Sequence, residues 1–225
     1  MSRGSTVKMK MSDGAEIGVY RVEPKGNRRG GLVVIQEIFG VTGHIKAVAD
    51  GFADDGYEVL APSLFDREQP GFQAGYSQDE MQRAIKVARQ DHPFAQSVAD
   101  ACTCISALED KGPVFMVGYC YGGSVVWAAA CECDGLSAAS SFYGSQVPAM
   151  ADRRPKCPVI CHFGEHDHGI PLDGVNKVQA AHPQVPVYIY DAGHGFNSDR
   201  PDHHNEAAAT LARQRTLDLF RANGG

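Results

Sequence analysis

The sequence predicts an α/β protein in which helices cover both faces of a mostly parallel sheet. Two observations favour this class. Short apolar runs rich in Val, Ile and Phe alternate with longer stretches of helical period, and these runs are continuous, which is typical of strands buried on both faces. The length of 225 residues, without a repeat, a low-complexity tract or a dividing linker, predicts a single domain spanning residues 1–225.

The predicted strands follow the apolar runs in chain order. The clearest is GLVVIQ at residues 31–36, and an antiparallel opening strand is expected at residues 16–22. The remaining strands are expected at residues 57–60, 114–118, 138–142, 159–163 and 185–190. The interval 63–75 is rich in Gly, Pro and Gln, which predicts a long loop of the kind that often lines a site.

Helices are predicted where apolar residues recur with the period of an α-helix. Such a stripe runs from Ile45 to Ala53 and ends at Gly56. Ser77, followed three residues later by Glu80, forms a capping box that starts a second helix. Further helices are expected over residues 94–108, after the glycine-rich segment 118–123, and over residues 206–221.

Composition and charge exclude several classes of partner. Hydrophobic residues make up 43% of the chain and charged residues 21%, which is ordinary for a globular protein and excludes a disordered one. The net charge of -6 and the scattered Lys and Arg argue against nucleic acid or an anionic membrane and favour small molecules. No run approaches the roughly 20 apolar residues of a membrane span. Nothing in the pattern predicts an oligomeric state.

The cysteines and the start of the chain predict a cytoplasmic location. The number of cysteines is odd, and no N-terminal apolar run resembles a signal peptide, so we expect reduced thiols. Two C-x-C pairs, Cys102 with Cys104 and Cys131 with Cys133, lie in predicted helices, where residues two apart point to different sides. The histidines between residues 162 and 168 lack a second ligand group with zinc spacing. We therefore predict no metal and no cofactor.

The strongest chemical signal is GYCYGG at residues 118–123, which follows an apolar strand. It has the form G-x-C-x-G, similar to the G-x-S-x-G elbow that presents a nucleophile on a tight strand-to-helix turn. That turn would place Cys120 at the positive end of the next helix, where a thiolate is favoured. Alternatively, Cys120 is a small buried hydrophobe, and the glycines serve only to pack the helix on the strand.

Two residues downstream would complete a catalytic triad. Asp167 follows the strand predicted at 159–163, and His194 follows the strand predicted at 185–190. The chain order of nucleophile, acid and histidine is that of α/β-hydrolases, and ligand sites form at the carboxyl edge of a parallel sheet. The histidine would carry the proton, and the carboxylate would orient it. Other candidates for the acid are Glu165, Asp173 and Asp191.

The segment QEIFG at residues 36–40 ends the clearest strand. Glu37 is either a partly buried acid at the edge of the site or the first solvated residue of a loop. The backbone N–H groups of Ile38 and Tyr121 would form the two-donor oxyanion hole of this architecture.

The segments QEIFGV, GYCYGG, GEHD and AGHGF, in this order, resemble the dienelactone hydrolase family of carboxymethylenebutenolidases, within the α/β-hydrolase fold. The resemblance implies a cofactor-independent hydrolase that opens a lactone or ester through a thioester on Cys120. It makes His194 the general base and then the acid, and Asp167 its orienting carboxylate. It also implies that Glu37 contacts the thiol and helps to generate the thiolate when a substrate carboxylate arrives.

The resemblance also suggests how a substrate carboxylate would be held. Arg83 aligns with one family arginine, and arginine suits bidentate contact with a carboxylate. Alternatively, Arg83 is an exposed helix arginine without a role in binding. Ser198 occupies the position of a second family arginine, with Arg200 two positions further as a stand-in. By position alone, Tyr119 and Tyr121 flank the nucleophile and would form part of the pocket wall; alternatively, both serve only aromatic packing. The turn after Arg83 lacks the aromatic residues typical of members that act on dienelactone.

Two other functions fit the same sequence. A general carboxylesterase or thioesterase on this scaffold would prefer uncharged esters and would not depend on Arg83. A non-catalytic member would keep the fold as a binding module, and its Cys120 would not be acylated.

Overall fold

Residues 3–225, which the computed structural model describes, form an eight-stranded sheet in the order β1-β2-β4-β3-β5-β6-β7-β8. The pairs β1–β2 and β2–β4 are antiparallel, and all other neighbours are parallel. The strands are β1 (Ser5–Lys10), β2 (Glu16–Val22), β3 (Gly30–Ile35), β4 (Tyr57–Pro62), β5 (Val114–Tyr119), β6 (Leu136–Phe142), β7 (Val159–Gly164) and β8 (Val187–Tyr190). The predicted mostly parallel sheet is confirmed.

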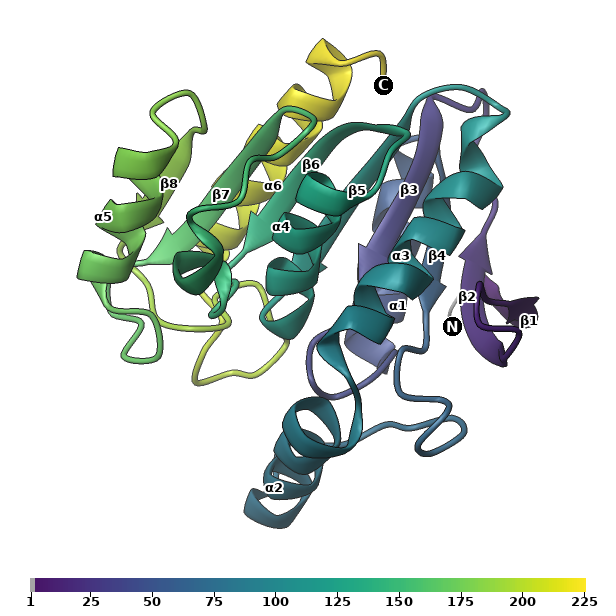
Figure 1. Cartoon of the computed structure of the whole chain (residues 1–225), viewed down its shortest axis with the longest axis horizontal. Coiled ribbons are helices and arrows are strands. Elements are labelled where there is room, and N and C mark those ends of the chain that lie inside the picture. The colour runs from purple at the N-terminus through teal and green to yellow at the C-terminus, as the bar shows by residue number, and fades with distance from the viewer. Residues whose placement is uncertain (1–2) are drawn as a thin grey trace.

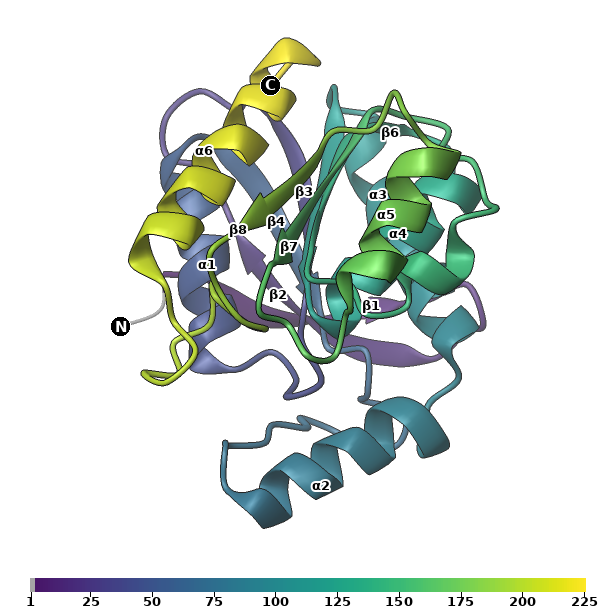
Figure 2. The ribbon, with the colours of Figure 1, turned by 90° about the vertical axis from the view of Figure 1, so that its left-hand side faces the viewer.

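Helices cover both faces of this sheet. Helices α3, α4 and α5 lie on one face, and α1 and α6 lie on the other (Figures 1 and 2). Helix α2 stands apart from both layers, beyond the ends of the strands (Figure 2). The helices are α1 (Gly43–Asp54), α2 (Gln78–Lys86), α3 (Phe94–Glu109), α4 (Tyr121–Glu132), α5 (Leu172–Ala181) and α6 (Glu206–Ala222), with a π-helix η1 (Val87–Asp91) and a 3-10 helix η2 (Val147–Met150).

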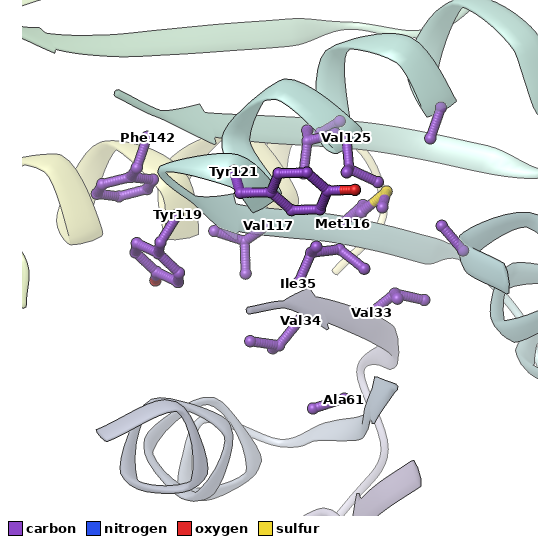
Figure 3. Packing of buried hydrophobic residues seen from close by; sticks show 14 of the residues in the cluster. Val33, Val34, Ile35, Ala61, Met116, Val117, Tyr119, Tyr121, Val125 and Phe142 are labelled. Atoms are coloured by element: carbon purple, nitrogen blue, oxygen red, sulfur yellow. The ribbon is translucent and has the colours of Figure 1, made fainter. Parts of the chain in front are cut away.

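The central strands β3 and β5 form the middle of the core. Every residue of both strands is buried, as their continuous apolar runs predict. Figure 3 shows Val33, Val34 and Ile35 of β3 beside Met116 and Val117 of β5. Burying each such side chain stabilises the fold by about 1.5–3 kcal/mol. The rigid centre therefore supports the loops that leave the carboxyl ends of these strands.

Besides the short helices η1 and η2, two elements were not predicted. Strand β1 is mostly exposed and polar, so it has no apolar run, and its pairing with β2 from Ser5–Arg21 to Lys10–Glu16 holds it at the edge of the sheet. Helix α5 buries only Val175 and Val178, too few positions to form a periodic stripe. The loop predicted at residues 63–75 contains neither helix nor strand.

The expectation of seven reduced thiols is wrong for one pair. Cys102 of α3 and Cys133, which caps α4, form a disulfide with their Cα atoms 5.5 Å apart. Spacing within each helix could not predict this bond, because it joins two different helices. The inference of a reducing compartment from the cysteines therefore loses its support. As for membranes, none of the helices within residues 3–225 is both long and apolar enough to cross one.

Candidate active site

Cys120 occupies the tight turn that the sequence predicts between β5 and α4. Its φ of 54° lies in the left-handed region, which non-glycine residues adopt at a cost of about 1–3 kcal/mol. A Cβ atom on Gly118 would lie 2.4 Å from the carbonyl oxygen of Gly122, and one on Gly122 would lie 2.5 Å from that of Ile35. Both positions therefore require glycine, because neighbouring backbone carbonyl groups leave no room for a Cβ atom. The turn leaves Cys120 partly exposed at the N-terminus of a 12-residue helix.

Three side chains from separate loops form one hydrogen-bonded chain. His194 Nε2 lies 3.1 Å from Cys120 Sγ, and His194 Nδ1 lies 2.6 Å from Asp167 Oδ2. Asp167 is buried, and its second oxygen accepts a hydrogen bond of 2.8 Å from the Gly169 amide. Since the carboxylate binds Nδ1, it holds the imidazole with Nε2 facing the sulfur. Such a chain can activate a sulfur nucleophile and move a proton.

The surroundings of His194 favour its charged form. Burial opposes a charge on the ring, but the hydrogen bonds to Asp167 and Cys120 outweigh it and raise the pKa of His194 to about 10. The imidazolium form of His194 is therefore favoured near neutral pH. Tyr143 packs its ring edge-on against His194 at 5.1 Å and has a φ of 38°, a second strained residue at this edge. Sequence reasoning missed Tyr143 because it lies one residue past a predicted strand.

Two adjoining cavities share Cys120 and His194 in their walls. The smaller, of about 210 Å³, is also lined by Glu37 and Ile38. The larger, of about 430 Å³, extends along the loops that carry Asp167 and His194. Cavities of this size admit a small organic molecule to the sulfur.

Comparison with known proteins identifies the family of this chain. The family model described as "Dienelactone hydrolase family" matches residues 17–224. The chain belongs to the dienelactone hydrolase family. It is 29% identical to a carboxymethylenebutenolidase of Pseudomonas sp. strain P51 over 218 residues, covering 92% of this chain and 91% of the relative. It is 32% identical over 237 residues to an Escherichia coli K12 protein provisionally named a carboxymethylenebutenolidase, covering 95% and 85%.

A solved structure supports the same assignment. A Klebsiella pneumoniae protein, provisionally named a dienelactone hydrolase, superposes with a TM-score of 0.83 at 26% identity, covering 97% of this chain and 98% of that one. The predicted α/β-hydrolase fold is confirmed. This dienelactone hydrolase family member is thus a carboxylic-ester hydrolase that acts on a lactone or ester.

The two predicted oxyanion-hole amides lie on neighbouring segments. A Cβ on Gly122 would lie 2.5 Å from the Ile35 carbonyl oxygen and 2.6 Å from that of Gln36, so the start of α4 lies close against the end of β3. The amide of Ile38 donates no hydrogen bond within residues 3–225, and that of Tyr121 is a first-turn amide without a carbonyl partner in its helix. Both donors are therefore available to a substrate oxygen.

Glu37 is a buried acid at the edge of the site, only 5% exposed. Its carboxyl group makes no hydrogen bond or ion pair within residues 3–225, so the thiol contact that the family resemblance implies is not seen as a direct bond. Burial raises the pKa of Glu37 to about 7, opposed by the charges of His194 and Arg200 and reinforced by that of Asp199. The acid therefore titrates near neutral pH.

We expect Glu37→Gln to stabilise the protein at alkaline pH. The folded protein retains a proton on Glu37 up to about pH 7, whereas the unfolded chain loses it near 4.5, so stability falls as pH rises through this window. At pH 8 the variant should exceed the wild type by up to about 3 kcal/mol, and below pH 4.5 the two should match. Urea unfolding at both pH values measures this. The exposed Glu165→Gln is the control, and an equal difference at both pH values would contradict the prediction.

The arginines differ from the predicted set. Arg83 is engaged elsewhere, since it donates a 2.7 Å hydrogen bond to the Gln73 carbonyl and covers the Phe72 ring, and it lines neither cavity. Arg200 lines the smaller cavity, as predicted. Arg89, which sequence reasoning missed, lines both cavities and makes no ion pair within residues 3–225. Its position on the π-helix η1, a feature frequent at functional sites, was not visible in the sequence.

Tyr119 is part of the core instead of the pocket wall. Its side chain is buried, packs on Phe142 at 4.8 Å and on Tyr143 at 6.3 Å, and lines neither cavity. Figure 3 shows Tyr119 and Tyr121 pointing into different parts of the core. The predicted substrate contact of Tyr119 is therefore corrected.

Proposed function

We propose that this protein opens small, carboxylate-bearing lactones or esters through a thioester on Cys120. It would act as one domain spanning residues 1–225, without a cofactor. The observation that carries the proposal is the hydrogen-bonded chain from Asp167 through His194 to Cys120, at 2.6 and 3.1 Å. The family membership supports the choice of ester and lactone substrates.

The steps follow from the positions of these groups. The Cys120 thiolate attacks the carbonyl carbon, and the amides of Ile38 and Tyr121 hold the oxyanion; each such donor is worth about 3 kcal/mol. His194 Nε2 then gives its proton to the leaving oxygen, which leaves a thioester on Cys120. For a lactone, the released hydroxyl stays attached to the acyl group. His194 next takes a proton from water, which attacks the thioester and frees the carboxylic acid and the thiol.

Glu37 would adjust the charge of the site. It lines the same cavity as Cys120 and Arg200, and its pKa of about 7 allows it to hold or release a proton under working conditions. An incoming carboxylate competes with Glu37 for the positive charge of Arg200. When that carboxylate neutralises the charge of Arg200, a protonated Glu37 is favoured, and in the scheme that the family resemblance implies the Cys120 thiol supplies the proton.

Arg89 and Arg200 are the proposed carboxylate ligands, in place of Arg83. Both line the cavity beside Cys120, and neither makes an ion pair within residues 3–225, so each can meet an anionic substrate without breaking an existing pair. An arginine–carboxylate hydrogen bond in such a site is worth about 1.5–3 kcal/mol.

We expect Arg89→Met to impair hydrolysis of anionic esters selectively. With 4-acetoxybenzoate, KM should rise roughly 10- to 100-fold, the equivalent of one charged hydrogen bond. With phenyl acetate, which lacks the carboxylate, the kinetic constants should stay within about twofold. Arg83→Met is the matched control and should leave both substrates unchanged. If the wild type prefers phenyl acetate and Arg89→Met changes KM equally for both esters, the protein is a general carboxylesterase. If the wild type hydrolyses neither ester, it is a binding module.

A further inference from the structure

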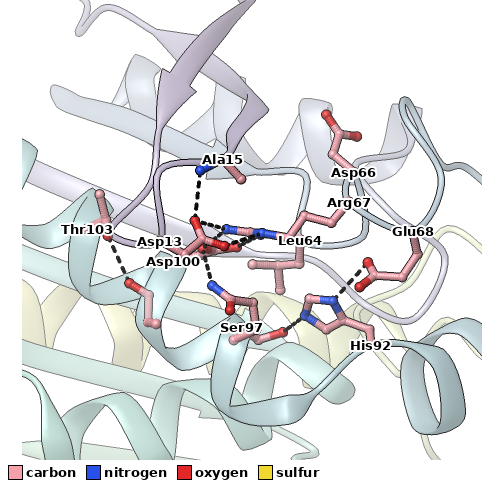
Figure 4. A network of polar contacts seen from close by, with 12 residues as sticks. Asp13, Ala15, Leu64, Asp66, Arg67, Glu68, His92, Ser97, Asp100 and Thr103 are labelled. Carbon is pink, nitrogen blue, oxygen red and sulfur yellow. Dashed lines mark hydrogen bonds and ion pairs between the residues drawn. The ribbon is translucent and has the colours of Figure 1, made fainter.

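A second chain of polar side chains ends at the residue that follows the nucleophile. Glu68 Oε2 lies 3.0 Å from His92 Nδ1, His92 Nε2 lies 2.9 Å from Ser97 Oγ, and Ser97 Oγ lies 2.8 Å from the Tyr121 hydroxyl. Figure 4 shows the His92 ring between Glu68 and Ser97. The four residues come from the loop 63–75, the end of η1, α3 and the first turn of α4.

For a neutral His92 ring, chemistry fixes the direction of every bond in this hydrogen-bonded chain. A carboxylate only accepts hydrogen bonds, so His92 Nδ1 carries the hydrogen and Nε2 accepts one. The Ser97 hydroxyl must therefore donate to Nε2, and its oxygen must accept from the Tyr121 phenol. Burial raises the pKa of Tyr121 to about 12, so the phenol keeps its proton under working conditions. One arrangement thus satisfies all four groups.

The chain is not a second hydrolytic site, although a serine, a histidine and a carboxylate in this order resemble one. Ser97 is fully buried, and neither of the cavities at Cys120 reaches it. An inaccessible hydroxyl cannot attack a substrate. These hydrogen-bonded side chains therefore act through Tyr121, at which they end.

Tyr121 is held firmly at its side-chain end. Besides the bond to Ser97, its ring contacts Phe65 at 5.6 Å and Phe94 at 5.7 Å, both edge-on. Its backbone N–H, at the other end of the same residue, is one of the two oxyanion donors. Oxyanion donors act at 2.7–3.1 Å, and a displacement of about 1 Å can cost roughly 100-fold in rate.

We infer that the chain Glu68–His92–Ser97 is a positioning device that sets the Tyr121 amide in the oxyanion hole. The same device ties η1, which carries Arg89 and ends beside His92, to the start of α4. It therefore fixes the substrate arginine and the oxyanion donor relative to each other. The inference rests on the proposed function, in which the Tyr121 amide binds the oxyanion.

Two variants test the inference by removing different hydrogen bonds from the Glu68–His92–Ser97–Tyr121 network. Tyr121→Phe and Ser97→Ala should each lower kcat for p-nitrophenyl acetate about tenfold, part of the loss expected for a missing oxyanion donor, with KM within about twofold. The double variant should be no worse than the more impaired single one, because both act through one chain.

The matched control is Tyr190→Phe, which also removes a hydrogen-bonded phenol from a network distant from the oxyanion donors. The Tyr190 hydroxyl lies 2.8 Å from His162 Nδ1 and 3.0 Å from Arg215. This control should lose stability in urea without a change in kcat. The inference is overturned if Tyr121→Phe and Ser97→Ala retain wild-type kcat, or if their effects multiply in the double variant. Failure of the proposed function gives a different result: Cys120 of the wild type would not become acylated during turnover.

Discussion

Replacement of Cys120 by alanine should lower kcat/KM for p-nitrophenyl acetate by at least about 10⁴-fold. The sulfur is the group that would form the covalent bond, and within residues 3–225 it is the only thiol or hydroxyl hydrogen-bonded to the His194 ring. Removing a triad nucleophile leaves only the catalysis of the oxyanion hole and of binding, roughly 10³–10⁴-fold over water. Initial-rate measurements with purified variant and wild type check this directly.

The same experiment can locate the covalent intermediate. Wild type quenched in acid during turnover should carry one acetyl group on the peptide that contains Cys120, detected by mass spectrometry. Cys131→Ala is the matched control, because it removes a partly buried free thiol from the same helix, and Cys131 lines neither cavity. Near-wild-type activity of Cys120→Ala, with an intact circular dichroism spectrum, would refute the thioester mechanism, as would acetylation confined to Cys131.

The layout of the site was predictable because it depends on local chain geometry. A tight turn between a buried strand and a helix needs small residues on both sides of Cys120, and Gly118 and Gly122 are found where a Cβ would collide with backbone. The carboxyl ends of parallel strands meet at one edge, which explains why Asp167 and His194 come within hydrogen-bond distance of each other.

The side chains that face a substrate were harder to predict because tertiary packing decides their direction. By sequence pattern, Arg83 was open to solvent or to a pocket, and Arg89, in the same helical region, carried no signal that singled it out. The π-helix η1 adds a residue to the turn and changes which side chains face the cavity. The Cys102–Cys133 disulfide was hidden for a similar reason, because no local pattern reports which helices pack together.

The two tyrosines beside the nucleophile show the same limit. Tyr119 ends a strand buried on both faces, so it packs into the core, whereas Tyr121 begins a helix and reaches across to Ser97. Their identical residue type and symmetrical placement around Cys120 gave no means to separate these roles. Neighbours that lie far away in the sequence decide these roles: Phe142 for Tyr119, and Phe65 and Ser97 for Tyr121.

Asp167→Asn should lower kcat by about 10⁴-fold while the fold remains intact. The carboxylate accepts the hydrogen of His194 Nδ1 at 2.6 Å and so leaves Nε2 to face the sulfur. An asparagine can present its amide hydrogens to Nδ1, which would stabilise the other tautomer and also remove the negative charge that favours the imidazolium. Stopped-flow and steady-state rates with p-nitrophenyl acetate measure the loss.

Asp191→Asn is the matched control, since Asp191 also pairs with a histidine, His166 at 2.7 Å, but on the exposed surface. That variant should keep kcat within about twofold, because exposed ion pairs contribute about 0–1 kcal/mol. Comparing kcat of the two variants shows whether the buried position of Asp167 beside the catalytic histidine matters, or whether any acid paired with a histidine has the same effect. If Asp191→Asn were the inactive variant and Asp167→Asn remained active, the orienting acid would lie in the alternative loop position, and the proton path through His194 Nδ1 would have to be redrawn from there.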